Sequence, residues 1–263
     1  METIQAVCDA INDFAPFETA MEWDNSGLLV GAPEEKVGKV GITLDVTDES
    51  LAEAQKKHCD CIVSHHPFLF SPVQKIYTST AFGRRLKWIL SGGISVIAAH
   101  TNWDVSPCGV NMILAEMLEL ENKAPLKESF DGAPRLWQGA TGMLPSPFST
   151  EEFALFAKES LSLQWIRVFG KKERVRKIAL CGGSGGGYRE SALTAGAELF
   201  LTSDMKYHEV QEAVDGGLSV ALADHGEVER LSIPFLKKEI QRRVDIEVVE
   251  LQQGCFDSGK TFV

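Results

Sequence analysis

Mostly apolar short runs alternate along this chain with longer segments whose apolar residues repeat at helical spacing. The runs at residues 61–64, 94–99, 199–202 and 218–223 predict buried strands. Helical spacing predicts helices over residues 109–120 and 232–243. Ser149 and Glu152 have the spacing of a capping box, which predicts a further helix running to about Leu161. This order of strands and helices predicts an α/β protein with mostly parallel sheets flanked by helices.

Two parts of the sequence resemble each other. Residues 37–42 are echoed by residues 175–180, and residues 92–99 are echoed by residues 216–223. An internal duplication explains this similarity, so we expect two related α/β domains. The segment 124–134 contains proline and glycine and predicts the junction. We therefore expect domains at residues 1–124 and 125–263.

The composition narrows the class of protein. The chain has 263 residues, of which 44% are hydrophobic and 24% charged, as in ordinary globular proteins and unlike disordered or fibrous ones. No apolar run approaches the roughly 18–20 residues of a membrane span, and no signal-like segment opens the chain. The net charge of −11 disfavours nucleic acid as a partner. We expect a cytoplasmic protein without a membrane partner, whose six cysteines stay reduced.

Side chains that bind metals concentrate where the predicted strands end. Parallel strands collect ligands beyond their carboxyl ends, so these residues are expected to lie near one another. Five of the six histidines and two carboxylates lie at or near such ends: His65, His66, His100, His208, His225, Asp104 and Glu229.

Imidazole and carboxylate groups together suit zinc, manganese, iron or nickel. Successive strand residues point in opposite directions, so His65 and His66 favour two cations over one shared cation. His225 and Glu229 are four residues apart on one helix face, and a carboxylate such as Glu229 can bridge two cations. Taken singly, a histidine pair or a helical ion pair has an ordinary structural explanation, but their coincidence with Asp104 at related strand ends predicts a centre of two divalent cations. Such a centre clamps a substrate oxygen and lowers the pKa of bound water.

A glycine-rich segment, residues 182–187, follows the predicted strand at residues 175–180. Its backbone N–H groups could bind a phosphate at the start of a helix. It lacks the Lys-Ser/Thr ending of a P-loop, and a tight strand-to-helix turn explains the glycines equally well. Both interpretations stay open on the sequence alone.

Six motifs that follow one another along the chain point to a protein family. They are Glu22-Trp23-Asp24-Asn25-Ser26-Gly27-Leu28, Ser64-His65-His66-Pro67, Ala99-His100-Thr101-Asn102-Trp103-Asp104, Gly182-Gly183-Ser184-Gly185, Ser203-Asp204-Met205-Lys206-Tyr207-His208 and His225-x-x-x-Glu229. Together they resemble the NGG-interacting factor three (Nif-three-like) family, whose members are often named GTP cyclohydrolase I type 2 homologues. The resemblance covers nearly the whole chain. It implies two α/β domains, a dinuclear metal site between them at the carboxyl ends of the strands, and a toroidal homohexamer.

The resemblance also assigns ligands by motif. It implies that His65, Asp104 and Glu229 hold one metal, and that His66, His225 and the shared Glu229 hold the other. One departure concerns the last motif, where family members commonly have glycine before the histidine. Here Gly226 follows His225, which is expected to weaken the first turn of a helix starting there.

Two functions from different classes fit these features. The first is a metal-dependent hydrolase of the GTP cyclohydrolase type, acting on a nucleotide or related heterocycle, with His100 or His208 moving protons as catalytic residues. The second is a non-catalytic metal-binding or adaptor protein with a regulatory or metal-handling role. The additional histidines favour the enzyme, and the acidic charge permits a small phosphorylated substrate while disfavouring large anionic polymers.

Overall fold

The computed structural model describes residues 2–127 and 136–252, so residues 128–134 of the expected junction lie outside the described residues. The described chain forms two compact units, the first from residues 2–103 and 233–252 and the second from residues 104–127 and 136–232. Each unit combines a main sheet with helices, which confirms a mixed α/β fold. Within these ranges no helix has both the length and the apolar character needed to cross a membrane.

The first unit is built on a five-stranded sheet with the order β13-β4-β5-β6-β2. Strands β13, β4, β5 and β6 pair in parallel, and β2 is an antiparallel edge strand beside β6. A separate two-stranded ribbon pairs β1 with β3. The elements of this unit are β1 (Glu2–Thr3), α1 (Ile4–Phe14), η1 (Phe17–Thr19), β2 (Gly27–Val30), β3 (Lys36–Val37), β4 (Lys39–Thr43), α2 (Asp48–Lys56), β5 (Cys61–Ser64), α3 (Ala81–Gly92), β6 (Ser95–Ala98), the start of α4 (Thr101–Asp104), α10 (Ile233–Gln241) and β13 (Glu247–Glu250).

Helices cover both faces of this sheet. Ile62 of β5 joins Leu51 of α2 and Ile89 of α3 in one core cluster. The preceding residue, Cys61, is fully buried and lies close to Cys8 of α1. Neighbouring residues of a strand face opposite sides of the sheet. Helices α2 and α3 therefore cover one face of the sheet, and α1 covers the other. Burial on both sides explains why β5 appears in the sequence as an uninterrupted apolar run.

The second unit contains a six-stranded sheet with the order β7-β8-β10-β11-β12-β9. Strands β10, β11 and β12 are parallel neighbours, whereas the pairings of β7, β8 and β9 are antiparallel. This sheet is therefore mixed rather than mostly parallel. Its unit consists of the end of α4, α5 (Val110–Met117), β7 (Glu121–Lys127), β8 (Gln138–Phe148), α6 (Thr150–Ser160), β9 (Ile166–Phe169), β10 (Val175–Leu180), η2 (Gly186–Tyr188), α7 (Arg189–Thr194), β11 (Leu199–Thr202), α8 (Tyr207–Asp215), β12 (Ser219–Ala223) and α9 (His225–Arg230).

Several elements form where the sequence predicts them. Strands β5 and β11 span the predicted residues, and α5 and α10 lie inside the two helices expected from apolar spacing. Helix α6 begins with the predicted capping box: the Ser149 hydroxyl accepts the Glu152 N–H at 3.1 Å, and the Glu152 carboxylate accepts the Ser149 N–H at 2.7 Å. Local chemistry therefore determines the start of this helix.

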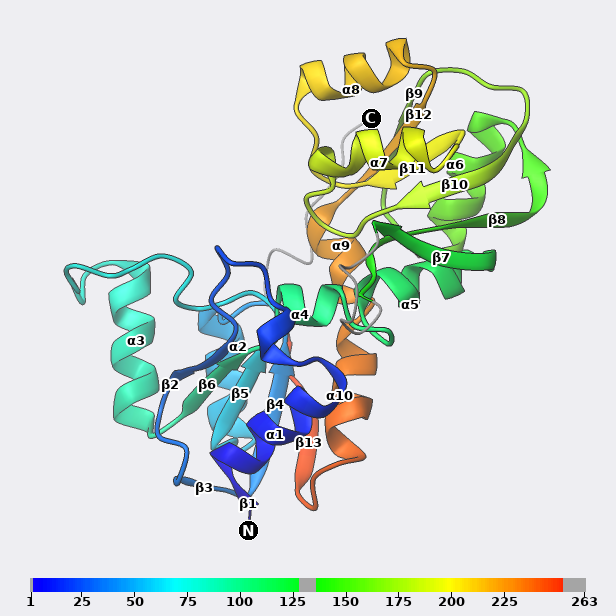
Figure 1. Ribbon diagram of the computed structural model, residues 1–263. Helices are drawn as coiled ribbons and strands as arrows, with labels where there is room; N and C mark the ends of the chain where they lie inside the picture. Colours follow the sequence, from blue (N-terminus) through cyan, green and yellow to red (C-terminus); the bar gives the residue numbers. More distant parts are fainter. Residues whose placement is uncertain (1, 128–135, 253–263) are drawn as a thin grey trace. The chain divides into compact units, whose positions relative to one another are not determined.

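The limits of the two units differ from the boundary expected near residue 125. Residues 121–127 form β7, the outer strand of the second sheet. At the other end of the chain, β13 pairs in parallel with β4, and α10 packs against α1 and β4. Figure 1 shows this return as an orange helix and a red strand beside α1 and β4. The last two described elements thus belong to the first unit, although the boundary expected near residue 125 placed them with the second half.

Five cysteines lie in the described ranges and take part in no disulfide bond there: Cys8, Cys59, Cys61, Cys108 and Cys181. The sixth, Cys255, lies outside the described residues.

Candidate metal centre

Three of the predicted site residues meet in the first unit, at the ends of neighbouring strands. His65 and His66 directly follow β5, and His100 lies two residues after the end of β6. The ring centroids are 5.1 Å apart for His65 and His66, 5.2 Å for His65 and His100, and 5.7 Å for His66 and His100. Each ring offers a nitrogen within 4.8 Å of the nitrogens offered by the other two. This imidazole cluster has the donor atoms and the spacing to hold a metal ion.

The three imidazoles are oriented in the same way, through Nδ1. Each Nδ1 lies at hydrogen-bonding distance from a main-chain carbonyl or a carboxylate: His65 from Ala99 O (2.8 Å), His66 from Asp45 Oδ1 (2.8 Å) and His100 from Asp24 Oδ1 (2.7 Å). Because a carbonyl or an ionised carboxylate can only accept, each Nδ1 donates its proton. In the neutral ring Nε2 then carries the lone pair that binds metals, with the ring fixed by its outer partner.

Asp24 fixes His100 from a fully buried side chain. Its carboxylate also accepts the Thr101 hydroxyl at 2.6 Å, the Thr101 N–H at 3.1 Å and the Ser26 hydroxyl at 2.9 Å. Burial alone would raise the pKa of Asp24, but the hydrogen bonds from these groups and the charge of His100 hold it well below its usual range. Asp24 is therefore a carboxylate that orients His100 across the neutral pH range.

His65 and His66 lie closer together than the alternation of strand residues implies. Strand β5 ends at Ser64, and the two histidines continue beside the end of β4, where their N–H groups donate to Thr43 O (3.0 Å) and Leu44 O (2.9 Å). Beyond the strand the alternation no longer applies. The rings are tilted by 44° and approach one another instead of facing opposite sides of the sheet.

Three further predicted ligands meet in the second unit. Helix α9 begins at His225 because Asp224 caps it, its Oδ1 accepting the Glu227 N–H at 3.0 Å. This cap stabilises the first turn despite Gly226. One turn later Glu229, only 3% exposed, places Oε2 3.0 Å from His225 Nε2. Asp104, the last residue of α4, offers a carboxylate oxygen within 4.8 Å of the one offered by Glu229.

The charges around His225 favour a cation. His225 Nδ1 lies 2.7 Å from Asp204 Oδ2, on the side of the ring opposite Glu229. Burial alone would lower the pKa of His225, but hydrogen bonds to Glu229 and Asp204 and their negative charges raise it to about 9. The pKa of the Cys181 thiol is raised first by burial and then by the charges of Asp104 and Glu229. A divalent cation bound to His225 Nε2 and Glu229 would replace a proton there, so the imidazole and carboxylate donors fit such a group.

The glycine-rich segment makes room for Glu229. Gly183 has φ +63°, and a Cβ at this position would collide with Glu229 Oε1 and lie 3.2 Å from His225 Nε2. The Gly183 carbonyl accepts N–H groups from Ser203 (3.1 Å) and Asp204 (3.2 Å), so it ties the turn to the end of β11. These contacts favour the interpretation as a tight turn, in which glycine is needed both for φ and for the approach of the carboxylate.

His208 is placed differently from the other predicted residues. It lies in the first turn of α8, with an exposed side chain, and belongs to none of the candidate metal-binding groups found in the described ranges. The structure thus brings together His65, His66 and His100 in one unit and Asp104, His225 and Glu229 in the other.

Sequence reasoning assigned no role to the carboxylates that orient the imidazoles. Asp45 and Asp204 each follow the end of a strand, β4 and β11, by two residues. The signal that drew attention to Asp104, a carboxylate just beyond a strand, was therefore present at both. Asp24 lies inside the first motif, but its partner His100 is 76 positions away in the sequence.

Comparisons with known proteins agree with this fold. A "GTP cyclohydrolase 1 type 2 homolog" of Clostridium acetobutylicum is 30% identical over 239 residues, covering 90% of this chain and 89% of the relative. A solved Staphylococcus aureus protein is 26% identical with a TM-score of 0.90, covering 99% of both chains. A Bacillus cereus protein related to NIF3 has the same fold, with a TM-score of 0.92 at 24% identity over 99% of this chain and 98% of its own.

The family match spans the two units. Residues 2–254 match the family described as Duf34/NIF3 (NGG1p interacting factor 3). This range contains all the histidines, aspartates and glutamates that form the clusters above. The chain therefore belongs to the Duf34/NIF3 family.

Proposed function

We propose that this chain is a dinuclear divalent-metal protein. His65, Asp104 and Glu229 hold one cation, and His66, His225 and the shared Glu229 hold the other. Imidazole nitrogens with carboxylate oxygens suit zinc, manganese, iron or nickel.

One observation carries this proposal above the others. The proposed histidine ligands all direct Nδ1 to an oxygen acceptor: His65 to Ala99, His66 to Asp45 and His225 to Asp204. Metal-binding histidines almost always have such an outer partner, which sets the tautomer and the direction of Nε2. Ordinary core packing gives no reason for the same arrangement at all three of these histidines.

The reaction that fits this site best is metal-dependent hydrolysis of the GTP cyclohydrolase type, on a nucleotide or related heterocycle. The name of the Clostridium acetobutylicum relative supports this class. Two divalent cations, when bound, polarise a substrate oxygen and provide activated water near neutral pH. His100 is fixed by Asp24 at Nδ1, so its Nε2 can accept or return a proton, which is the relation of a general base to its orienting carboxylate. His208 is the second candidate for moving protons, from an exposed position on α8.

The remaining proposals concern the molecule as a whole. The two units derive from one duplicated α/β unit, which the matching parallel order of β4-β5-β6 and β10-β11-β12 supports. The chain assembles into a homohexamer and acts on a small molecule in the cytoplasm. Closed symmetric assemblies are the usual outcome for soluble homo-oligomers.

A turnover screen tests the proposed reaction. Metal-loaded protein is incubated with purine nucleotides and cyclic amides, alongside protein treated with a chelator and an Asp24→Ala variant. We expect product only with the metal-loaded parent, and a strongly reduced rate for Asp24→Ala at unchanged metal content. Absence of turnover for every compound, with both cations bound, contradicts the hydrolase and supports the metal-binding or adaptor function.

A further inference from the structure

A second feature of the first unit lies beside His100. A cavity of about 490 Å³ is formed by the residues around Asp24, by residues 69–73 and Ile76 of the segment after β5, and by Leu86 of α3. Small-molecule sites commonly have volumes of roughly 300–1,000 Å³. The cavity is therefore large enough for a ligand of the size of a nucleoside.

Aromatic rings connect this cavity to the imidazole cluster. Trp23 and Phe70, both in the cavity wall, have ring centroids 6.0 Å apart and lie 6.1 Å and 6.3 Å from the His100 ring. All three contacts are edge-to-face, so the rings do not cover one another. Trp23 is 62% exposed and Phe70 is 53% exposed. Two large aromatic surfaces thus face solvent immediately beside the residue proposed to move protons.

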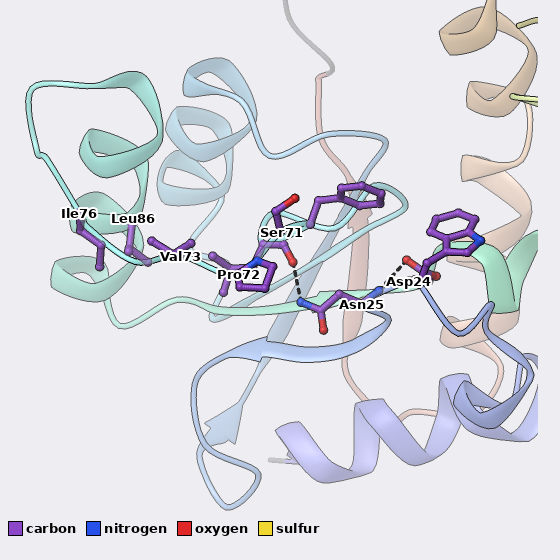
Figure 2. A pocket seen from close by; sticks show the side chains of 10 residues that line it. Asp24, Asn25, Ser71, Pro72, Val73, Ile76 and Leu86 are labelled. Atoms are coloured by element: carbon purple, nitrogen blue, oxygen red, sulfur yellow. Dashed lines mark hydrogen bonds between the residues drawn. The ribbon is translucent and has the colours of Figure 1, made fainter.

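The polarity changes along the cavity. Figure 2 shows Val73, Ile76 and Leu86 at one end of the labelled residues and Asp24 at the other, with Asn25 and Ser71 between them. Asn25 donates its side-chain N–H to the Leu69 carbonyl, which holds the amide against the segment after β5. The lining contains no lysine or arginine, and its one carboxylate, Asp24, is engaged by His100 and Thr101. The cavity therefore offers aromatic surface and amide or hydroxyl hydrogen bonding, without a cation for a phosphate.

We propose that this cavity binds an uncharged planar heteroaromatic ring, packed face-on against one of the Trp23 and Phe70 rings and edge-on against the other, with the reacting end of the ligand directed toward His100. The inference rests on the proposed function in one respect, since it identifies the ring as the base or heterocycle of the substrate. Aromatic side chains bind nucleobases by stacking with little dependence on sequence or charge, because every base has a π face. Any phosphate of the same substrate then lies outside this cavity.

Binding of neutral probes to the full chain tests the ring site apart from the metals. Inosine and nicotinamide are titrated into chelator-treated protein by calorimetry and by ligand-observed NMR. We expect both to bind, and Trp23→Ala and Phe70→Ala each to weaken inosine binding by at least about five-fold. Trp23→Phe, which keeps an aromatic face, is expected to retain most of the affinity. Tyr77→Ala is the matched control, because Tyr77 is an exposed aromatic residue next to Ile76 that does not line the cavity.

Several results would overturn the inference. One is that neither probe binds at millimolar concentration. Another is that both alanine variants bind inosine as tightly as the parent, and a third is that inorganic phosphate competes with inosine for the site. Circular dichroism verifies that each variant is folded. Ring binding without any turnover would support the cavity and contradict the hydrolase. Metal-dependent turnover with unchanged affinities in the alanine variants would contradict the cavity alone.

Discussion

The negative charge of Glu229 contributes more to cation binding than that of any other residue in the proposed centre. It is nearly fully buried, it contacts His225 Nε2, and its carboxylate lies near that of Asp104. A buried negative charge beside a second carboxylate is unfavourable unless a cation compensates it. In the proposed centre Glu229 is also the one ligand shared by both cations, so its charge acts on each of them.

Replacing the shared ligand is therefore expected to affect both cations. Glu229→Gln keeps the size of the side chain but removes the charge that attracts two dications, and we expect it to lower the occupancy of both. Asp104→Asn is expected to empty mainly one. Metal titration by calorimetry on the two variants distinguishes these outcomes. Binding of two ions by Glu229→Gln as tightly as by the parent contradicts the bridging assignment.

Asp24 gives a prediction about stability and pH. Its pKa in the folded protein is lowered, so its stabilisation is present above the unfolded-state pKa of about 3.9 and is lost as the pH falls below it. Near pH 7 we expect Asp24→Asn to reduce the free energy of unfolding by about 1.5–3 kcal/mol, since hydrogen bonds to a charged group are lost. Below about pH 4 the difference from the parent should narrow.

Urea unfolding of chelator-treated protein at a series of pH values measures this difference. The exposed Asp215, in the last turn of α8, provides the control variant Asp215→Asn, which should follow the parent at every pH. A difference between Asp24→Asn and the parent that stays constant down to pH 2 would contradict the role given to the Asp24 carboxylate.

At the scale of elements, the turn after β10 positions a ligand through its backbone. Gly183→Ala introduces a Cβ at a left-handed residue and against Glu229, so we expect a loss of about 1–2 kcal/mol in stability together with reduced metal occupancy. Gly187→Ala is the matched control, because a Cβ there meets no atom within 4 Å. Urea unfolding and metal titration of both variants test this. Parent-like metal binding by Gly183→Ala would show that Glu229 does not depend on the turn.

Elements with local signals were predictable, and elements formed by distant pairing were not. Helix α6 carries its own capping box, and β5 and β11 are buried on both faces, so their sequences identify them. Strand β13 is a short strand that forms by pairing with β4, where residues 247–250 lie beside residues 39–42 from near the start of the chain. The unit limits depend on that pairing, which explains why a boundary inferred from composition near residue 125 differs from the observed ones.

The same distinction applies to the site. Histidines at strand ends can be identified from the sequence, because the apolar runs show where the strands end. The partners of those histidines are set by the arrangement of strands: Asp45 reaches His66 only because β4 and β5 are parallel neighbours. Asp24 reaches His100 because β2 pairs with β6 at the edge of the sheet. These contacts follow from the topology, so only the structure could identify them.

At the scale of the whole molecule, the proposed assembly has a direct test. We expect light scattering at micromolar concentration to give a mass close to six times the 28.8 kDa of one chain. A closed ring leaves no unpaired copy of its interface, so a single species is expected rather than a series. A mass near 28.8 kDa would contradict the hexamer without affecting the proposal for the metal ligands.

Elemental analysis of purified protein under metal-replete conditions shows whether the chain holds a dinuclear metal centre. We expect close to two divalent cations per chain, because five ligands with one bridging carboxylate form two sites. A His65→Ala/His66→Ala double variant should lose both cations, whereas His58→Asn, at an exposed histidine outside the clusters, should retain them. Protein without bound metal, or metal content equal in the double variant and the parent, would contradict a dinuclear centre at these residues.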